Sequence, residues 1–275
     1  MTMANTLAPL TGWIDGIGLI GPGLPDWETG RRMLAGTLDY RPTPTTVTLP
    51  PILPAAERRR TSLAVRIALA SGHQAVAASS FAAEHLHSVF SSSGGDGVTC
   101  HLICAALAEA DRRVSPTQFH NSVHNAAAGY FGIAARNARA STSVAGGDAS
   151  AGSGLLEAMV QLATDAGPVL FASYDLAYPF PLSEVRAVRG ALAVALVLTP
   201  EAPAASPVRA RLRVSTATAP GPAPDPLPAA LHASLRDNPT AALLPLLQAL
   251  ARRRAATVPL PLGGPGWLRV ALEPR

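Results

Sequence analysis

The sequence predicts an α/β fold, in which helices pack against a central sheet. Short apolar runs typical of buried strands, above all residues 169–174 and 189–199, alternate with longer segments of helical periodicity. With 275 residues, of which 48% are hydrophobic and 15% charged, the chain can bury a sizeable core. The low charged fraction fits a body that is partly covered by a partner. A GC-rich genome, which favours Ala, Pro and Arg codons, explains the composition equally well.

The first third of the chain contains one predicted strand and two predicted helices. Residues 13–23 (WIDGIGLIGPG) form an apolar run that ends in a Gly/Pro turn, which indicates a strand. Asp26 precedes WETGRRMLAG and is a favourable N-cap, so we expect a capped helix there. Residues 40–54 are rich in Pro and Thr and should be irregular, whereas residues 58–80 have the apolar spacing of a helix.

The middle of the chain predicts two further strands, each close to a helix. Residues 88–92 are strand-like and run into the flexible sequence SSGGDG, after which residues 98–110 favour a helix. Residues 140–145 (ASTSVA) are prone to form a strand. Gly146-Gly147-Asp148 then predicts a tight turn that leads into a helix of small residues over 149–163.

The last third is less regular. Residues 200–228 are rich in Pro and Ala and contain one strand candidate, residues 210–215. Residues 227–254 favour helix apart from a break at Asn238-Pro239, and residues 268–272 are a candidate for the last strand.

Composition argues against several classes of protein. The net charge of +4 comes from Arg, because the chain contains no Lys, and its densest runs are residues 58–60 and 252–254. No basic stripe with interleaved aromatic residues is present, so nucleic-acid binding is not expected. Each run is explained more simply as a solvated helix end than as a docking site for an acidic partner. No stretch of about 18 apolar residues or signal peptide is recognised, which predicts a cytoplasmic chain without a membrane span.

The only two cysteines, Cys100 and Cys104, are four residues apart on one face of a predicted helix. Two cysteines make neither a disulfide framework nor a zinc site, so we expect them to be buried small apolar residues. No cofactor is expected.

A polar cluster at FHNSVHN offers the best alternative chemistry. Its histidines have the i, i+4 spacing of zinc hydrolases, but Asn121 stands where those enzymes have Glu, and no GxSxG elbow surrounds Ser122. The pattern therefore predicts a structural polar network without metal. A divergent acyltransferase or hydrolase that uses Asp148, Ser122 or a histidine remains the alternative. The cluster comprises Phe119, His120, Asn121, Ser122, Val123, His124 and Asn125.

The order of four segments resembles the N-terminal half of a β-ketoacyl synthase, which has the thiolase fold. They read IDGIGLIGPG, ERRRTSLAVRIALASGHQAV, ASTSVAGGDASAGSGLLEAM and RGALAVALVLTP. Within that group the chain is most similar to the chain length factors of aryl polyene pigment clusters, and residues 115–133 (SPTQFHNSVHNAAAGYFGI) are the most specific stretch. The resemblance implies a ketosynthase-like half over residues 10–200 and a shortened extension of helices and strands over residues 201–275.

The resemblance also implies an elbow at Gly146, Gly147 and Asp148, where ketosynthases carry their nucleophilic cysteine at a helix N-terminus. A carboxylate is a poor nucleophile toward a thioester, because the product would be a more reactive anhydride. We therefore expect Asp148 to be an N-cap. Only 75 residues follow Pro200, with His232 as their single histidine. A βαβ unit needs about 30 or more residues, so a complete second half with its catalytic histidines does not fit.

The implied function is that of a non-catalytic subunit. It would form a heterodimer with an active ketosynthase of type II polyketide or fatty-acid-like biosynthesis, help shape the acyl tunnel, and meet acyl carrier protein transiently. In this family the strand that matches residues 140–145 lies at the dimer interface. The interface residues are then Ser141, Thr142, Ser143 and Val144.

Overall fold

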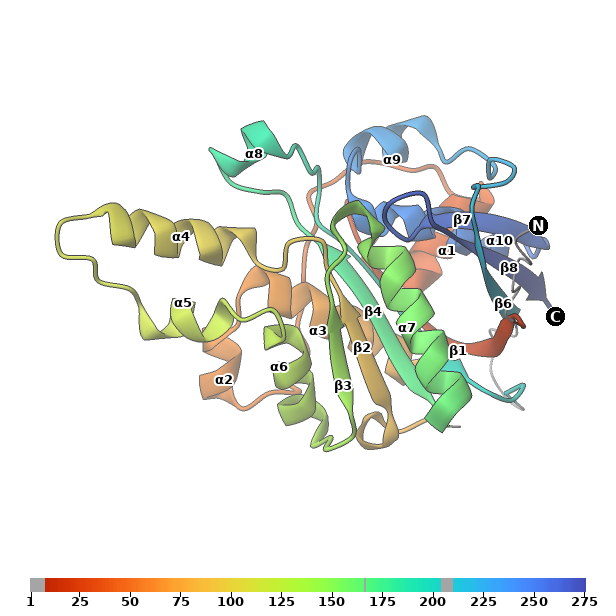
Figure 1. Ribbon diagram of the computed structural model, residues 1–275, viewed down its shortest axis with the longest axis horizontal. Helices are drawn as coiled ribbons and strands as arrows, with labels where there is room; N and C mark the ends of the chain where they lie inside the picture. Colours follow the sequence, from red (N-terminus) through yellow and green to blue (C-terminus); the bar gives the residue numbers. More distant parts are fainter. Residues whose placement is uncertain (1–7, 166, 204–209) are drawn as a thin grey trace, which may run out of the picture.

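The strands of the protein form a single mixed sheet (Figure 1). The computed structural model describes residues 8–165, 167–203 and 210–275. Part of the predicted irregular stretch 200–228 therefore lies outside the described residues. Within them the strand order is β3-β2-β4-β5-β1-β6-β8-β7; β3, β2 and β4 run parallel, and every other neighbouring pair is antiparallel. The strands are β1 Leu10–Ile20, β2 His87–Ser91, β3 Ser141–Val144, β4 Val169–Asp175, β5 Leu192–Thr199, β6 Ala210–Ala217, β7 Ala256–Pro261 and β8 Trp267–Pro274.

Helices cover both faces of the sheet. They are α1 Trp27–Ala35, α2 Ala55–Arg60, α3 Leu63–Ala77, α4 Gly97–Ala108, α5 Pro116–Asn121, α6 Ala126–Ala135, α7 Ser150–Asp165, α8 Leu182–Val185, α9 Ala229–Ser234 and α10 Leu244–Ala251, with 3-10 turns η1 Ala83–His85, η2 Gly147–Ala149 and η3 Pro239–Leu243. One buried cluster joins α3 and α6 to Leu170 and Ala195, and the other joins α7 and α10 to Phe171 and Leu196. This arrangement confirms the predicted α/β class.

Close packing against helix α3 explains the glycines of strand β1. A Cβ atom on Gly16 or Gly18 would lie 2.0 or 1.9 Å from the carbonyl oxygen of Ala75 or Ser71, respectively. Helix α3 therefore rests directly on the backbone of β1, and only glycine fits beneath it. The sequence IDGIGLIG is a strand shaped to receive this helix.

Helix boundaries follow local capping. Asp26 caps α1 as predicted, because its Oδ1 accepts from the Thr29 amide at 2.7 Å. The predicted helix 58–80 is interrupted: α2 ends at Arg60, Thr61 is extended, and α3 begins after Ser62, whose hydroxyl accepts from the Val65 amide at 3.3 Å. A serine cap inside an apolar pattern thus starts a new helix.

The residues after 210 continue the same sheet. Strand β6 pairs with β1, and β8 and β7 extend the sheet beyond it. The break at Asn238-Pro239 is observed, since η3 begins at Pro239. The sequence did not predict β7, because Pro259 and Pro261 are unusual in strands. Both prolines are tolerated because β7 is the outermost strand at this edge.

Helices α4 and α5 form an arm that projects from the body (Figure 1). The prediction that Cys100 and Cys104 are buried is wrong, because both are exposed on α4. Thr99 is the one α4 residue that is buried, although the helix is strongly apolar. The apolar pattern is real, but among the described residues α5 is the main neighbour of α4, and most of the helix stays exposed or half-buried. No helix in the described parts of the chain is long and apolar enough to cross a membrane.

Candidate functional site

The candidate site lies where the three parallel strands β3, β2 and β4 end. Because carboxyl ends of parallel strands meet at one edge, the loops that follow them converge. A Cβ atom on Gly94 or Gly97 would lie 1.7 or 2.3 Å from the Tyr178 side chain, so the loops after β2 and β4 are in contact. Arg186, beyond α8, reaches Asp148 after β3.

The predicted tight turn is present between β3 and α7. Gly147 has φ +58°, which favours glycine, and the Gly146 amide donates to Ser150 Oγ at 2.9 Å. The Ser150 hydroxyl in turn donates to the Gly147 carbonyl at 2.7 Å. Ser150 therefore holds the turn closed, a role that the sequence alone did not reveal.

Asp148 does not cap the helix as predicted. Its side chain is 85% exposed, and its carboxylate accepts from the Arg186 guanidinium at 2.5 Å. The Arg186 guanidinium also lies 6.0 Å from the centroid of the Tyr178 ring. The ion pair of Asp148 thus ties the turn after β3 to the loop after β4.

A second carboxylate, Asp175, ends β4 and is buried. It accepts from the Ser93 amide at 2.8 Å, the Ser93 hydroxyl at 2.6 Å and the Thr240 hydroxyl at 2.9 Å. Burial raises the pKa of this carboxyl above its ordinary range, although the hydrogen bonds from Ser93 and Thr240 act in the opposite direction. These bonds join the loop after β2 to η3. Asp175 is therefore a structural anchor beneath the site.

The FHNSVHN cluster does not form one continuous helix. Helix α5 ends at Asn121, so His120 and His124 do not share a helix face. His120 instead packs edge-on against Tyr130 at 5.8 Å, and the Ser122 hydroxyl donates to the Phe119 carbonyl at 2.8 Å. Among the described residues no three His, Cys, Asp or Glu side chains gather as they would around a metal ion.

Both cysteine thiols lie on the exposed arm, on helix α4. Partial desolvation raises the pKa of the Cys100 thiol, and the nearby Asp96 and Cys104 add to the rise. The reactive thiolate is therefore disfavoured at neutral pH.

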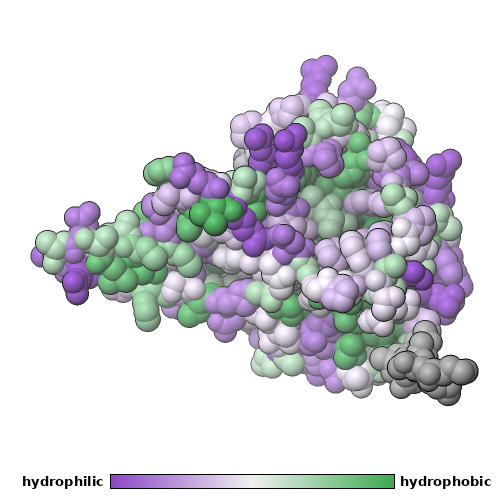
Figure 2. Space-filling model, turned by 45° about the horizontal axis from the view of Figure 1, so that its top comes forward, coloured by the Kyte–Doolittle hydropathy of each residue, from purple (hydrophilic) through white to green (hydrophobic). Residues whose placement is uncertain are grey.

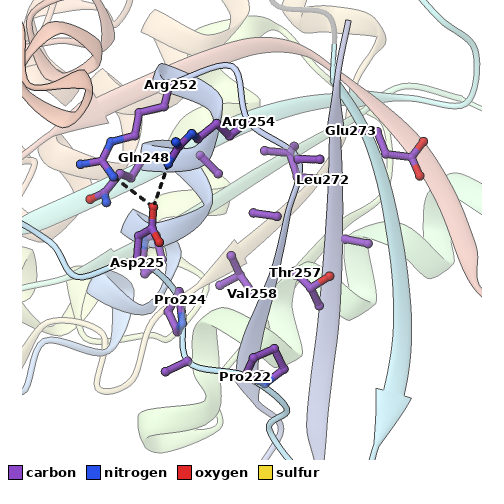
Figure 3. Close-up of a pocket in the computed structure, with 16 residues that line it drawn as sticks. Pro222, Pro224, Asp225, Gln248, Arg252, Arg254, Thr257, Val258, Leu272 and Glu273 are labelled. Carbon is purple, nitrogen blue, oxygen red and sulfur yellow. Dashed lines mark hydrogen bonds and ion pairs between the residues drawn. The ribbon is translucent and has the colours of Figure 1, made fainter.

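A cavity of about 750 Å³ lies elsewhere, between α10, the β7–β8 hairpin and residues 222–225 (Figure 3). Asp225 pairs there with Arg252 at 3.1 Å and with Arg254 at 3.7 Å. The cavity shares no lining residue with the elbow. Two of the three arginines in the run 252–254 thus hold a proline-rich loop against the end of α10.

The comparisons with known proteins agree with this architecture. The family described as β-ketoacyl synthase, N-terminal domain, matches residues 37–242, three quarters of the chain. The chain belongs to this family. The match extends into η3 and so includes residues on both sides of position 200. No curated protein matches the chain.

Two similar solved structures come from complexes. The first is described as a ketosynthase (ApeO) in complex with its chain length factor (ApeC) from Xenorhabdus doucetiae; it is 23% identical, has a TM-score of 0.71, and the match covers 95% of this chain and 99% of that one. The ishigamide ketosynthase/chain length factor is 16% identical with a TM-score of 0.69, covering 97% and 99%. The fold is therefore that of the thiolase-like half of a ketosynthase.

A full ketosynthase matches over less of its length. The ketosynthase from module 6 of the bacillaene synthase from Bacillus subtilis 168 is 18% identical, with a TM-score of 0.51. The match covers 69% of this chain but 36% of that chain.

Proposed function

We propose that this chain is a non-catalytic subunit of the chain length factor type. It pairs with an active β-ketoacyl synthase in type II polyketide biosynthesis, of the aryl polyene kind, or in a fatty-acid-like pathway. It stabilises that enzyme, helps shape the tunnel for the growing chain, and meets acyl carrier protein only transiently. The observation that supports the proposal is that, among the described residues, β3 is the last strand at one edge of the sheet and leads into the turn that carries Asp148.

The two edges of the sheet differ in a way that supports pairing at β3. Strand β7 carries Pro259 and Pro261, which lack backbone N–H groups and discourage further strand addition. Strand β3, at the opposite edge, carries none, and its residues are Ser, Thr, Ser and Val. An unprotected edge is a liability for a lone chain, and an interface removes that liability.

One side chain on β3 also lacks a hydrogen-bond partner among the described residues. The Ser143 hydroxyl is buried without a hydrogen-bond partner among the described residues, whereas Thr142 accepts from Gln161 at 2.9 Å. A buried, unpaired hydroxyl next to an open edge fits a surface that is completed by another chain.

The projecting arm adds an apolar surface. Leu107 and Phe119 are 50% and 69% exposed, and Val123 is also exposed. Figure 2 shows hydrophobic residues gathered along the projecting end of the molecule. Exposed apolar patches of this kind mark interaction sites, and obligate interfaces are large and hydrophobic.

Chain length supports the subunit type. In each of the two complexes the matched chain has about the length of this chain. The match covers 95% of this chain and 99% of the other in the first case, and 97% and 99% in the second.

A chain-extension assay tests the proposal. The ketosynthase of the same gene cluster, supplied with loaded acyl carrier protein, should form full-length product only when this chain is present. The chain alone should form none, and its intact mass should show no acyl adduct. Product made equally well by the ketosynthase alone would contradict the proposal. Changed product length in a Phe119→Ala complex would distinguish tunnel shaping from passive stabilisation.

A further inference from the structure

A small lobe follows β4 and projects from the body of the protein (Figure 1). We define it as residues 179–187, which include the short helix α8. None of its residues is buried, and Phe180 and Val185 are 70% and 92% exposed. The lobe therefore has no core of its own, and segments with few buried apolar contacts open most easily.

Both ends of the lobe are fixed to the body. At the first end, the Tyr178 side chain packs so closely against Gly94 and Gly97 that a Cβ atom on either glycine would collide with it. At the other end, Asn238 Nδ2 donates to the Arg189 carbonyl at 3.2 Å. The lobe is thus a loop between two anchored points, and it can rearrange while the sheet stays in place.

Among the described residues, the backbone hydrogen bonds of the lobe stay within residues 179–188. The Ser183 amide donates to the Pro179 carbonyl and the Arg186 amide to the Leu182 carbonyl, each at 3.0 Å. Helix α8 has only 4 residues, and a helix of this length is not stable in water by itself. A contact outside the lobe must therefore keep it ordered.

The Arg186 side chain supplies that contact. It donates to Asp148 Oδ1 at 2.5 Å, across 38 residues of sequence, and within the described chain this is the one hydrogen bond or ion pair that joins the lobe to the body. The Arg186 side chain is 34% exposed and that of Asp148 85%. Ion pairs in contact with water contribute little and are weakened by salt, so this tether breaks more easily than the anchors at the two ends.

We propose that the Asp148–Arg186 pair is a latch that keeps the lobe folded against the turn after β3. When salt screens the pair, or an anion competes for the guanidinium, α8 unravels while the sheet and both anchors stay intact. Asp148 thereby controls the order of a segment that is distant in the sequence. The exposed Phe180 and Val185 keep a fixed arrangement only while the latch is closed.

Hydrogen–deuterium exchange on the full chain, followed by mass spectrometry, tests the latch. In Asp148→Asn the amides of residues 183–186 should exchange about two- to fivefold faster, the factor that corresponds to an exposed ion pair. An ionic strength of about 1 M, at which the Debye length is about 3 Å, should speed exchange similarly in the wild type and add little in Asp148→Asn. The amides of β4 should be unaffected in both cases.

Two further variants isolate the cause. Asp148→Arg combined with Arg186→Asp reverses the polarity of the pair and should restore slow exchange. Asp225→Asn breaks the ion pair with Arg252 at the end of α10 and should leave the lobe unchanged. Equal exchange of the lobe in wild type and Asp148→Asn, at low and at high salt, would refute the latch. Fast exchange that persists in the charge-reversed variant would refute it too, because ion pairing would then not be the cause.

Discussion

The direction of the β3 hydrogen bonds makes a sharp prediction about pairing. The Ser88 amide donates to the Ala140 carbonyl and the Ser92 amide to the Val144 carbonyl, both at 3.1 Å. Successive residues of a strand point their backbone N–H and C=O groups to opposite sides. Thr142 therefore also bonds toward β2, whereas Ser143 presents its backbone groups at the outer edge. Ser143→Pro therefore removes a donor at the interface and leaves the β2–β3 ladder intact.

The expected magnitude follows from the bonds lost. One backbone hydrogen bond contributes about 0.5–1.5 kcal/mol, and the proline ring also displaces the neighbouring bond. A loss of about 1–3 kcal/mol weakens heterodimer affinity about 5- to 150-fold, which interferometry on the purified partners can measure.

Two control variants isolate the cause. Ser143→Ala keeps the backbone N–H and removes only the side-chain hydroxyl, so its affinity should fall less than that of Ser143→Pro. Thr142→Pro should instead lower the melting temperature of the chain, because that residue bonds to β2. Wild-type affinity in Ser143→Pro would show that β3 is not the pairing edge.

Four further outcomes are expected. Asp148→Cys alone should not gain condensation activity in a chain-extension assay, because the side chain at this position is paired with Arg186 and not with a histidine that could assist the reaction. Asp148→Ala should cost less than about 1 kcal/mol in denaturant unfolding, because an exposed ion pair contributes little; a larger loss would reveal a cap that the structure does not show. The pKa of Asp175 is raised in the folded chain, so the folded state holds that proton more tightly than the unfolded state. Stability should then fall as pH rises from the ordinary aspartate value near 3.9 through the raised value, and Asp175→Asn should flatten this dependence in unfolding curves; an unchanged slope would refute the assignment. Elemental analysis should find no stoichiometric zinc, and one zinc per chain that is lost in His120→Ala would overturn the structural interpretation of FHNSVHN.

Local signals predicted much of the fold because they act over a few residues. Asp26 begins α1 as a cap, the Gly-rich turn after β3 forms the elbow, and Asn238-Pro239 breaks the helical stretch. The interruption before α3 was missed, since a serine cap at Ser62 is hidden within a continuous apolar pattern.

Features that depend on distant residues were not predictable from the sequence. Asp148 was expected to cap a helix, but its partner Arg186 lies 38 residues further along the chain. The bonds of Asp175 come from positions 93 and 240. Cys100 and Cys104 were expected to be buried because a free cysteine usually behaves as a small apolar residue, but the sequence does not tell which chain covers their helix.

Size-exclusion chromatography with light scattering tests the central claim most directly. The chain should aggregate when it is expressed alone and should elute as a one-to-one heterodimer when it is co-expressed with the ketosynthase of its gene cluster. A stable, monodisperse monomer at micromolar concentration, without affinity for any ketosynthase of that cluster, would contradict the account.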